Sequence, residues 1–114
     1  MKLVGKTKQE LLKKRKEQKI EELSNNCNTF REEILDDKRI MNILSGATTG
    51  YPDYLTPENV KWLIELFRNL YHTYKDEIEL AESIEEVDEI FEGIVYPTEE
   101  YVLNQLKMEG IKYE

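Results

Sequence analysis

The chain has 114 residues, a net charge of −8 and one cysteine. This length suits a single domain with its own core, and one cysteine leaves no internal disulfide. Seven Tyr, three Phe and one Trp argue against a disordered chain. No apolar run reaches the length of a membrane-spanning helix, and no signal-peptide core follows the first residues. We therefore expect no membrane partner, no secretion by a signal peptide and a reducing compartment.

The charge is divided unevenly along the chain. Residues 1–20 carry eight Lys or Arg and two Glu, whereas residues 21–114 carry eight Lys or Arg and 22 Asp or Glu. The local charges are +6 and −14. Nine of the seventeen residues in 76–92 are acidic. This asymmetry predicts a molecule with a basic end and an acidic remainder.

The first expected element is a long helix that starts at a capping box, Thr7 with Glu10. Apolar residues then recur at steps of three and four, namely Ile20, Leu23, Cys27, Phe30 and Ile34. This pattern predicts one helix of about 28 residues. Continued backwards, the same face reaches Lys16 and Lys13. We therefore expect the first half of the helix to project from the core.

Four further elements are expected to be helical. Asp36-Asp37 breaks or re-caps the chain before a short helix at residues 40–44, and residues 47–55 form a loop. Thr56-Pro57 starts the central helix, which runs to about residue 81. Ser83 and Thr98 cap two short final helices. The predicted fold is all-α: a small helical bundle, divided into a basic helical arm at 1–19 and a helical domain at 20–114.

Residues suited to catalysis are scarce. His72 is the single histidine, and Cys27 lies on the apolar face of the first helix, where it acts as a small hydrophobe. These two residues cannot form a zinc site, and no glycine-rich phosphate loop is present. We expect no enzyme activity, no catalytic residues, no cofactor and no metal.

Two segments are candidates for binding a partner. The first is the basic arm, and the second is the loop at 51–55, whose tyrosines suit packing or binding. Their candidate residues are Lys6, Lys8, Lys13, Lys14, Arg15, Lys16, Tyr51 and Tyr54. The arm has no aromatic residue for stacking on bases. Either segment is also compatible with a structural role, as a solvated helix end or a packed loop.

Two stretches resemble helices of tailed-phage tail-associated proteins. Residues 16–34 contain Ile20-Glu21-Glu22-Leu23-Ser24-Asn25-Asn26-Cys27-Asn28, and residues 74–90 contain Ile78-Glu79-Leu80-Ala81-Glu82-Ser83-Ile84-Glu85-Glu86-Val87. Together they cover about a third of the chain. The resemblance implies a virion or tail-assembly context and assigns no functional residue.

Three functions are open at this point. The leading hypothesis is a non-enzymatic interaction protein, a small virion or tail-associated component that binds other virion proteins. The second is an acidic inhibitor of a host nucleic-acid enzyme, and the third is a regulator that binds nucleic acid through the basic arm. The expected location is the virion or the host cytoplasm. Whether the chain forms a homo-oligomer is left open.

Overall fold

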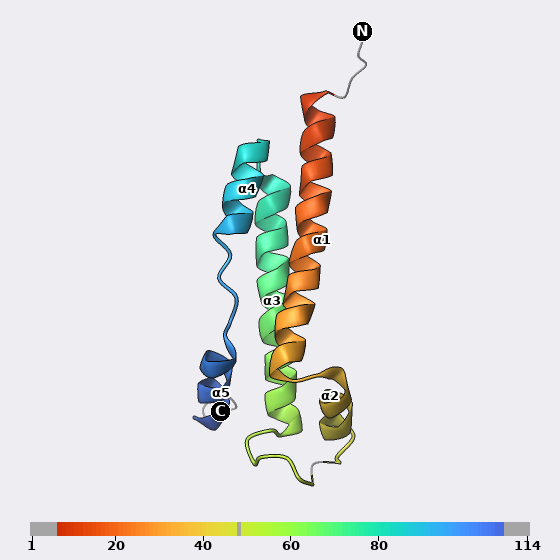
Figure 1. Ribbon diagram of the computed structural model, residues 1–114, viewed down its shortest axis with the longest axis vertical. Coiled ribbons are helices and arrows are strands. Elements are labelled where there is room, and N and C mark those ends of the chain that lie inside the picture. Colours follow the sequence, from red (N-terminus) through yellow and green to blue (C-terminus); the bar gives the residue numbers. More distant parts are fainter. Residues whose placement is uncertain (1–6, 48, 109–114) are drawn as a thin grey trace. The chain divides into compact units, whose positions relative to one another are not determined.

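The computed structural model describes residues 7–47 and 49–108. These residues form five α-helices and no strand (Figure 1). The helices are α1 (Lys8–Ile34), α2 (Asp37–Leu44), α3 (Pro57–Leu80), α4 (Ile84–Glu92) and α5 (Glu99–Lys107). The predicted all-α class is confirmed, and the long N-terminal helix packs against other helices.

The helices begin where the capping residues predicted. The Thr7 backbone N–H donates to the Glu10 carboxylate at 2.9 Å, and the Glu10 N–H donates back to the Thr7 hydroxyl at 3.1 Å. Asp36 re-caps the chain, because its carboxylate accepts from the Arg39 N–H. Ser83 and Thr98 do the same for α4 and α5. Each cap satisfies a backbone donor that the first turn of a helix leaves unpaired.

The chain divides into two compact units. Unit 1 comprises residues 1–26 and 70–95, and unit 2 comprises residues 27–69 and 96–114. The long helices α1 and α3 each contribute to both units. The division falls at residues 26, 69 and 95, whereas the arm-and-domain boundary expected from the sequence fell at residue 19.

Unit 2 holds most of the buried apolar side chains. Its core is formed by Cys27, Ile34, Leu35, Ile40, Ile43, Leu55, Val60, Leu63, Phe67, Val102 and Leu106. Cys27 and Ile34 lie on the predicted apolar face of the first helix and are buried, but Phe30 on the same face is 37% exposed. The turn from α2 into the loop uses Gly46 and Gly50, both with positive φ, a conformation in which an L side chain is strained.

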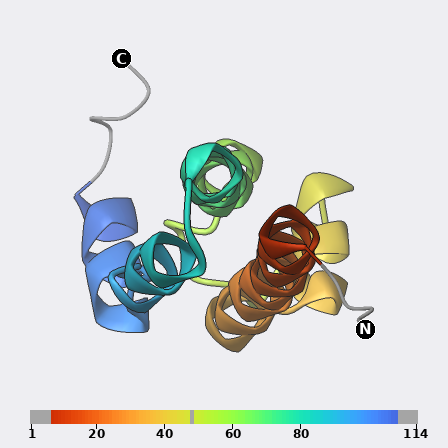
Figure 2. The same ribbon diagram turned by 90° about the horizontal axis from the view of Figure 1, so that it is seen from above.

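Unit 1 has a thinner core, made by the first half of α1, the end of α3 and α4 (Figure 1, Figure 2). Its buried apolar side chains are Leu23, Ile78, Ala81, Val87 and Ile94. The basic half of α1 was expected to project from the core, but it packs against other helices. Leu12, Arg15 and Lys16 are half-buried within this unit. The sequence predicts a buried face that begins only at Ile20, because long basic side chains before it are expected to be solvated.

Candidate functional site

Three basic side chains of α1 contact residues 76–92, which we call the acidic segment, within unit 1. The Lys16 ammonium donates to the Glu79 backbone carbonyl at 2.6 Å. Arg15 Nε lies 3.6 Å from Asp88 Oδ1, an ion pair without a hydrogen bond. The Lys19 ammonium lies 4.5 Å from the centre of the Phe91 ring. The basic half of α1 thus covers the acidic segment with its own side chains.

The contact made by Lys16 has a clear electrostatic reason. Glu79 lies in the last turn of α3, where backbone carbonyls lack helical partners and carry partial negative charge. The last turn of α3 contains no basic residue of its own. Lys16 supplies that cation from α1. Its aliphatic stem, like those of Arg15 and Lys19, covers apolar surface that the small core of unit 1 leaves open.

Three other basic residues of the predicted arm are exposed. Lys8, Lys13 and Lys14 face solvent, and Lys6 lies outside the described residues. Of the six arm residues expected to bind a partner, Arg15 and Lys16 are therefore engaged within the fold. The outward-facing charge of this helix half is smaller than the sequence indicated.

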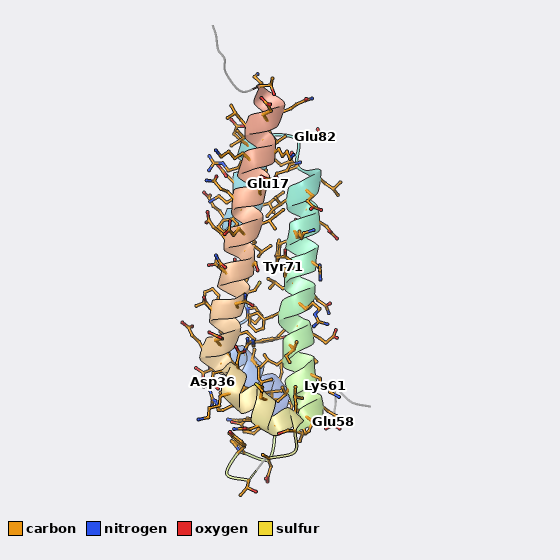
Figure 3. All side chains as sticks on the ribbon, turned by 90° about the vertical axis from the view of Figure 1, so that its right-hand side faces the viewer. Glu17, Asp36, Glu58, Lys61, Tyr71 and Glu82 are labelled. Carbon is orange, nitrogen blue, oxygen red and sulfur yellow. The ribbon has the colours of Figure 1, made fainter. Side chains whose placement is uncertain are left out.

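A row of four carboxylates runs from the residue before the N-cap Ser83 along α4. Glu82, Glu85, Glu89 and Glu92 recur at steps of three and four residues and are all exposed. We call these four residues the acidic stripe. In the part of the chain that the structure describes, none of them has an ion-pair partner. Figure 3 shows Glu82 at the turn from α3 to α4, at the end of unit 1 where α1 begins.

The acidic stripe keeps its position because the other face of α4 is apolar. Val87 is fully buried, and Ile84, Ile90 and Phe91 are half-buried. The Glu82 backbone N–H donates to the Glu86 carboxylate at 3.0 Å, and the Ser83 hydroxyl accepts from the Glu86 N–H. This capping box fixes the start of the helix and hence the direction of the stripe.

The two candidate tyrosines lie together in unit 2. Tyr51 and Tyr54 border a hollow of about 370 Å³ whose floor includes Leu35, Leu63 and Leu106. Both tyrosines also have structural contacts. The Tyr51 hydroxyl accepts from the Asn42 side chain at 3.1 Å, and the Tyr54 carbonyl accepts from the Asn59 side-chain amide. The Tyr51 side chain and the Tyr54 backbone thus hold the loop in place, and the hollow beside the two tyrosines is a second candidate surface.

The two groups considered for catalysis are a thiol and an imidazole. Cys27 is buried in unit 2, and burial raises the pKa of its thiol to about 11, so that it is protonated at neutral pH. His72 is exposed in unit 1, with its ring 5.3 Å from that of Tyr71. Among residues 7–47 and 49–108, no group of three or more His, Cys, Asp or Glu is placed to hold a metal ion.

Comparison with known proteins gives no relative. No protein-family model, curated protein or solved structure matches the chain. The resemblance to tail-associated proteins therefore stays a prediction. Within the described part of the chain, no helix has both the length and the apolar character needed to span a membrane.

Sequence reasoning found the acidic segment but not its organisation. The steps between Glu85, Glu89 and Glu92 follow the helical repeat of α4, and this signal is present in the sequence. Two further acidic residues lie between them and obscure it: the Glu86 carboxylate accepts from the Glu82 N–H, and the Asp88 carboxylate pairs with Arg15. The pairing of Arg15 with Asp88 joins residues far apart in the chain, and no local pattern indicates it.

Proposed function

We propose that the protein is a non-enzymatic interaction protein that binds a basic protein surface through the acidic stripe of unit 1. The observation that carries the proposal is the contrast between the two sets of charges. Arg15, Lys16 and Lys19 face inward onto the acidic segment, whereas the four stripe carboxylates face solvent without an ion-pair partner in the described chain.

A row of carboxylates on a short helix suits a basic partner for two physical reasons. The three stripe residues on α4 rise by about 5 Å from one to the next along the helix axis, so their fields add within the screening length of about 8 Å at physiological salt. The charges are also held on a helix with a fixed start, so little side-chain or backbone ordering is needed on binding. Such a surface steers a basic partner and favours fast association.

This arrangement favours the acidic-inhibitor hypothesis over the nucleic-acid regulator. A nucleic-acid surface on α1 would have to rely on Lys8, Lys13 and Lys14. The side chains of Arg15, Lys16 and Lys19 contact unit 1 itself, and Arg31 pairs with Asp37. Thirteen acidic residues in the same compact unit would repel phosphates. A nucleic-acid-binding face of another protein is a fitting target, because it presents the basic groups that the stripe lacks.

The tail-associated context is compatible with the same surface. A virion protein with a basic face would be a partner of the required chemistry. The resemblance of residues 16–34 and 74–90 to tail-associated helices supports that setting, and co-purification of the protein with particles tests it.

The decisive experiment changes the stripe and measures binding to a defined probe. All four stripe residues are replaced by Gln, and fluorescence anisotropy follows binding to a synthetic helix with Arg and Lys at steps of three and four. Losing four charges should weaken binding by tenfold or more, on the order of 1.4 kcal/mol for each factor of ten. Affinity should also fall in about 0.5 M salt, where charges are strongly screened.

The matched control removes four carboxylates elsewhere on exposed helix positions: Glu17, Glu21, Glu32 and Glu58 to Gln. Both variants have the same net charge. Equal loss of affinity in both would show that only net charge matters and would overturn the proposal. Displacement of DNA from a DNA-binding protein by the wild-type protein, without direct binding to DNA, would separate the inhibitor from the regulator.

A further inference from the structure

Unit 2 contains an aromatic hollow that neither the basic arm nor the acidic stripe explains. The rings of Phe30 and Tyr96 are stacked, with centroids 4.8 Å apart and planes 25° from parallel. Both rings border a hollow of about 240 Å³. Phe30 comes from α1 and Tyr96 from the segment between α4 and α5. Phe30 is 37% exposed although it occupies a position of the apolar face.

Two carboxylates border the same hollow. Glu33 lies one helical turn after Phe30, and Glu99 is the first residue of α5. Both are exposed. Among residues 7–47 and 49–108, neither has an ion-pair partner, because the nearby cations Arg31 and Arg39 pair with Asp37 and Asp36. Within the described chain, the hollow is bordered by no cationic residue.

We propose that this hollow binds the side chain of an arginine presented by a protein partner. The aromatic faces and the unpaired carboxylates each attract a cation. A guanidinium satisfies both at once, because it is flat enough to stack on a ring and its N–H groups fork onto carboxylates. A lysine ammonium has the charge but not the plane. We call this the arginine pocket, and it does not depend on the acidic stripe.

The geometry also explains why the pocket is preformed. The ring pair is held from both sides, by the helical position of Phe30 and by the start of α5. There, the Thr98 hydroxyl accepts from the Tyr101 N–H at 3.1 Å. Ile34, which is 8% exposed, also borders the hollow and gives it an apolar wall. A guanidinium that stacks there loses little hydration, because guanidinium is weakly hydrated compared with ammonium.

Three small probes separate the components of the proposal. The full chain is titrated with the N-acetyl amides of arginine, lysine and citrulline, and NMR follows the ring protons of Phe30 and Tyr96. Citrulline keeps the flat group without the charge, and lysine keeps the charge without the flat group. Arginine should give saturable shifts of both rings, with a Kd on the order of 1–10 mM, and the other two should bind at least about threefold more weakly.

A pair of isosteric double variants tests the carboxylates. Glu33→Gln with Glu99→Gln should weaken arginine binding by about tenfold, since each removes a charge-assisted partner. The control is Glu32→Gln with Glu100→Gln, which removes two adjacent exposed charges that do not border the hollow. Equal binding of arginine and citrulline, equal binding of arginine and lysine, or equal losses in the two double variants would each overturn the proposal. Unchanged circular dichroism of both variants ensures that the comparison concerns binding and not folding.

Discussion

The two compact units are stabilised in different ways. In the described chain, unit 1 has five buried apolar side chains and unit 2 has eleven. Unit 2 buries large residues such as Phe67 and Leu63, so area removed from water dominates its stability. Unit 1 adds basic stems and their ionic contacts to a core of smaller side chains such as Ala81 and Val87. A perturbation of packing should therefore affect unit 2 most, and a perturbation of charge should affect unit 1 most.

The largest expected effect is on the packing of unit 2. Phe67 is 4% exposed, and Phe67→Ala should lower the free energy of unfolding by about 3–5 kcal/mol, through lost burial and the remaining cavity. Urea denaturation followed by circular dichroism measures the loss. Met41→Ala is the control in the same unit, because Met41 is 70% exposed and should change stability by less than about 0.5 kcal/mol. Similar midpoints for the two variants would contradict the assigned core.

Cys27 provides a pH-dependent test of the same core. Burial raises the pKa of its thiol from 9.0 to about 11, so the folded state holds the proton more tightly than the unfolded state. This contribution is complete below pH 9 and is lost as the pH rises through about 11, by at most about 2–3 kcal/mol. The difference in unfolding free energy between wild type and Cys27→Ala should therefore shrink across that interval. A difference that stays constant from pH 8 to 11 would show that the thiol is hydrated.

Local sequence signals predicted the helices well because helix starts depend on neighbouring residues. Thr7 with Glu10, Asp36, Ser83 and Thr98 each cap a helix near the expected residue. The course of the basic half of α1 could not be predicted in the same way. Its contacts depend on Glu79 and Asp88, more than sixty residues away in the chain. The same applies to Phe30 and Tyr96, whose stacking defines the arginine pocket.

Equivalent caps allow the units to be compared directly. Ser83→Ala removes the hydroxyl that accepts from the Glu86 N–H in unit 1, and Thr98→Ala removes the equivalent acceptor in unit 2. Each should cost about 1 kcal/mol. If unit 1 is the less stable unit, hydrogen exchange should give a lower opening free energy for α4 in Ser83→Ala than for α5 in Thr98→Ala. The reverse order would contradict the inference that five buried side chains give unit 1 the weaker core.

The smallest expected effect concerns the charges of unit 1. Lys16→Met keeps the apolar stem and removes the ammonium that donates to the Glu79 carbonyl. Loss of this exposed hydrogen bond should cost only about 0.5 kcal/mol, because the carbonyl regains water when Lys16 is replaced. Faster hydrogen exchange should be confined to the end of α3 and to α4. Lys14→Met, at an exposed position of the same helix, should leave exchange unchanged. If both variants behave alike, the inward turn of the basic residues contributes no stability, and the charges of α1 are free to bind a partner after all.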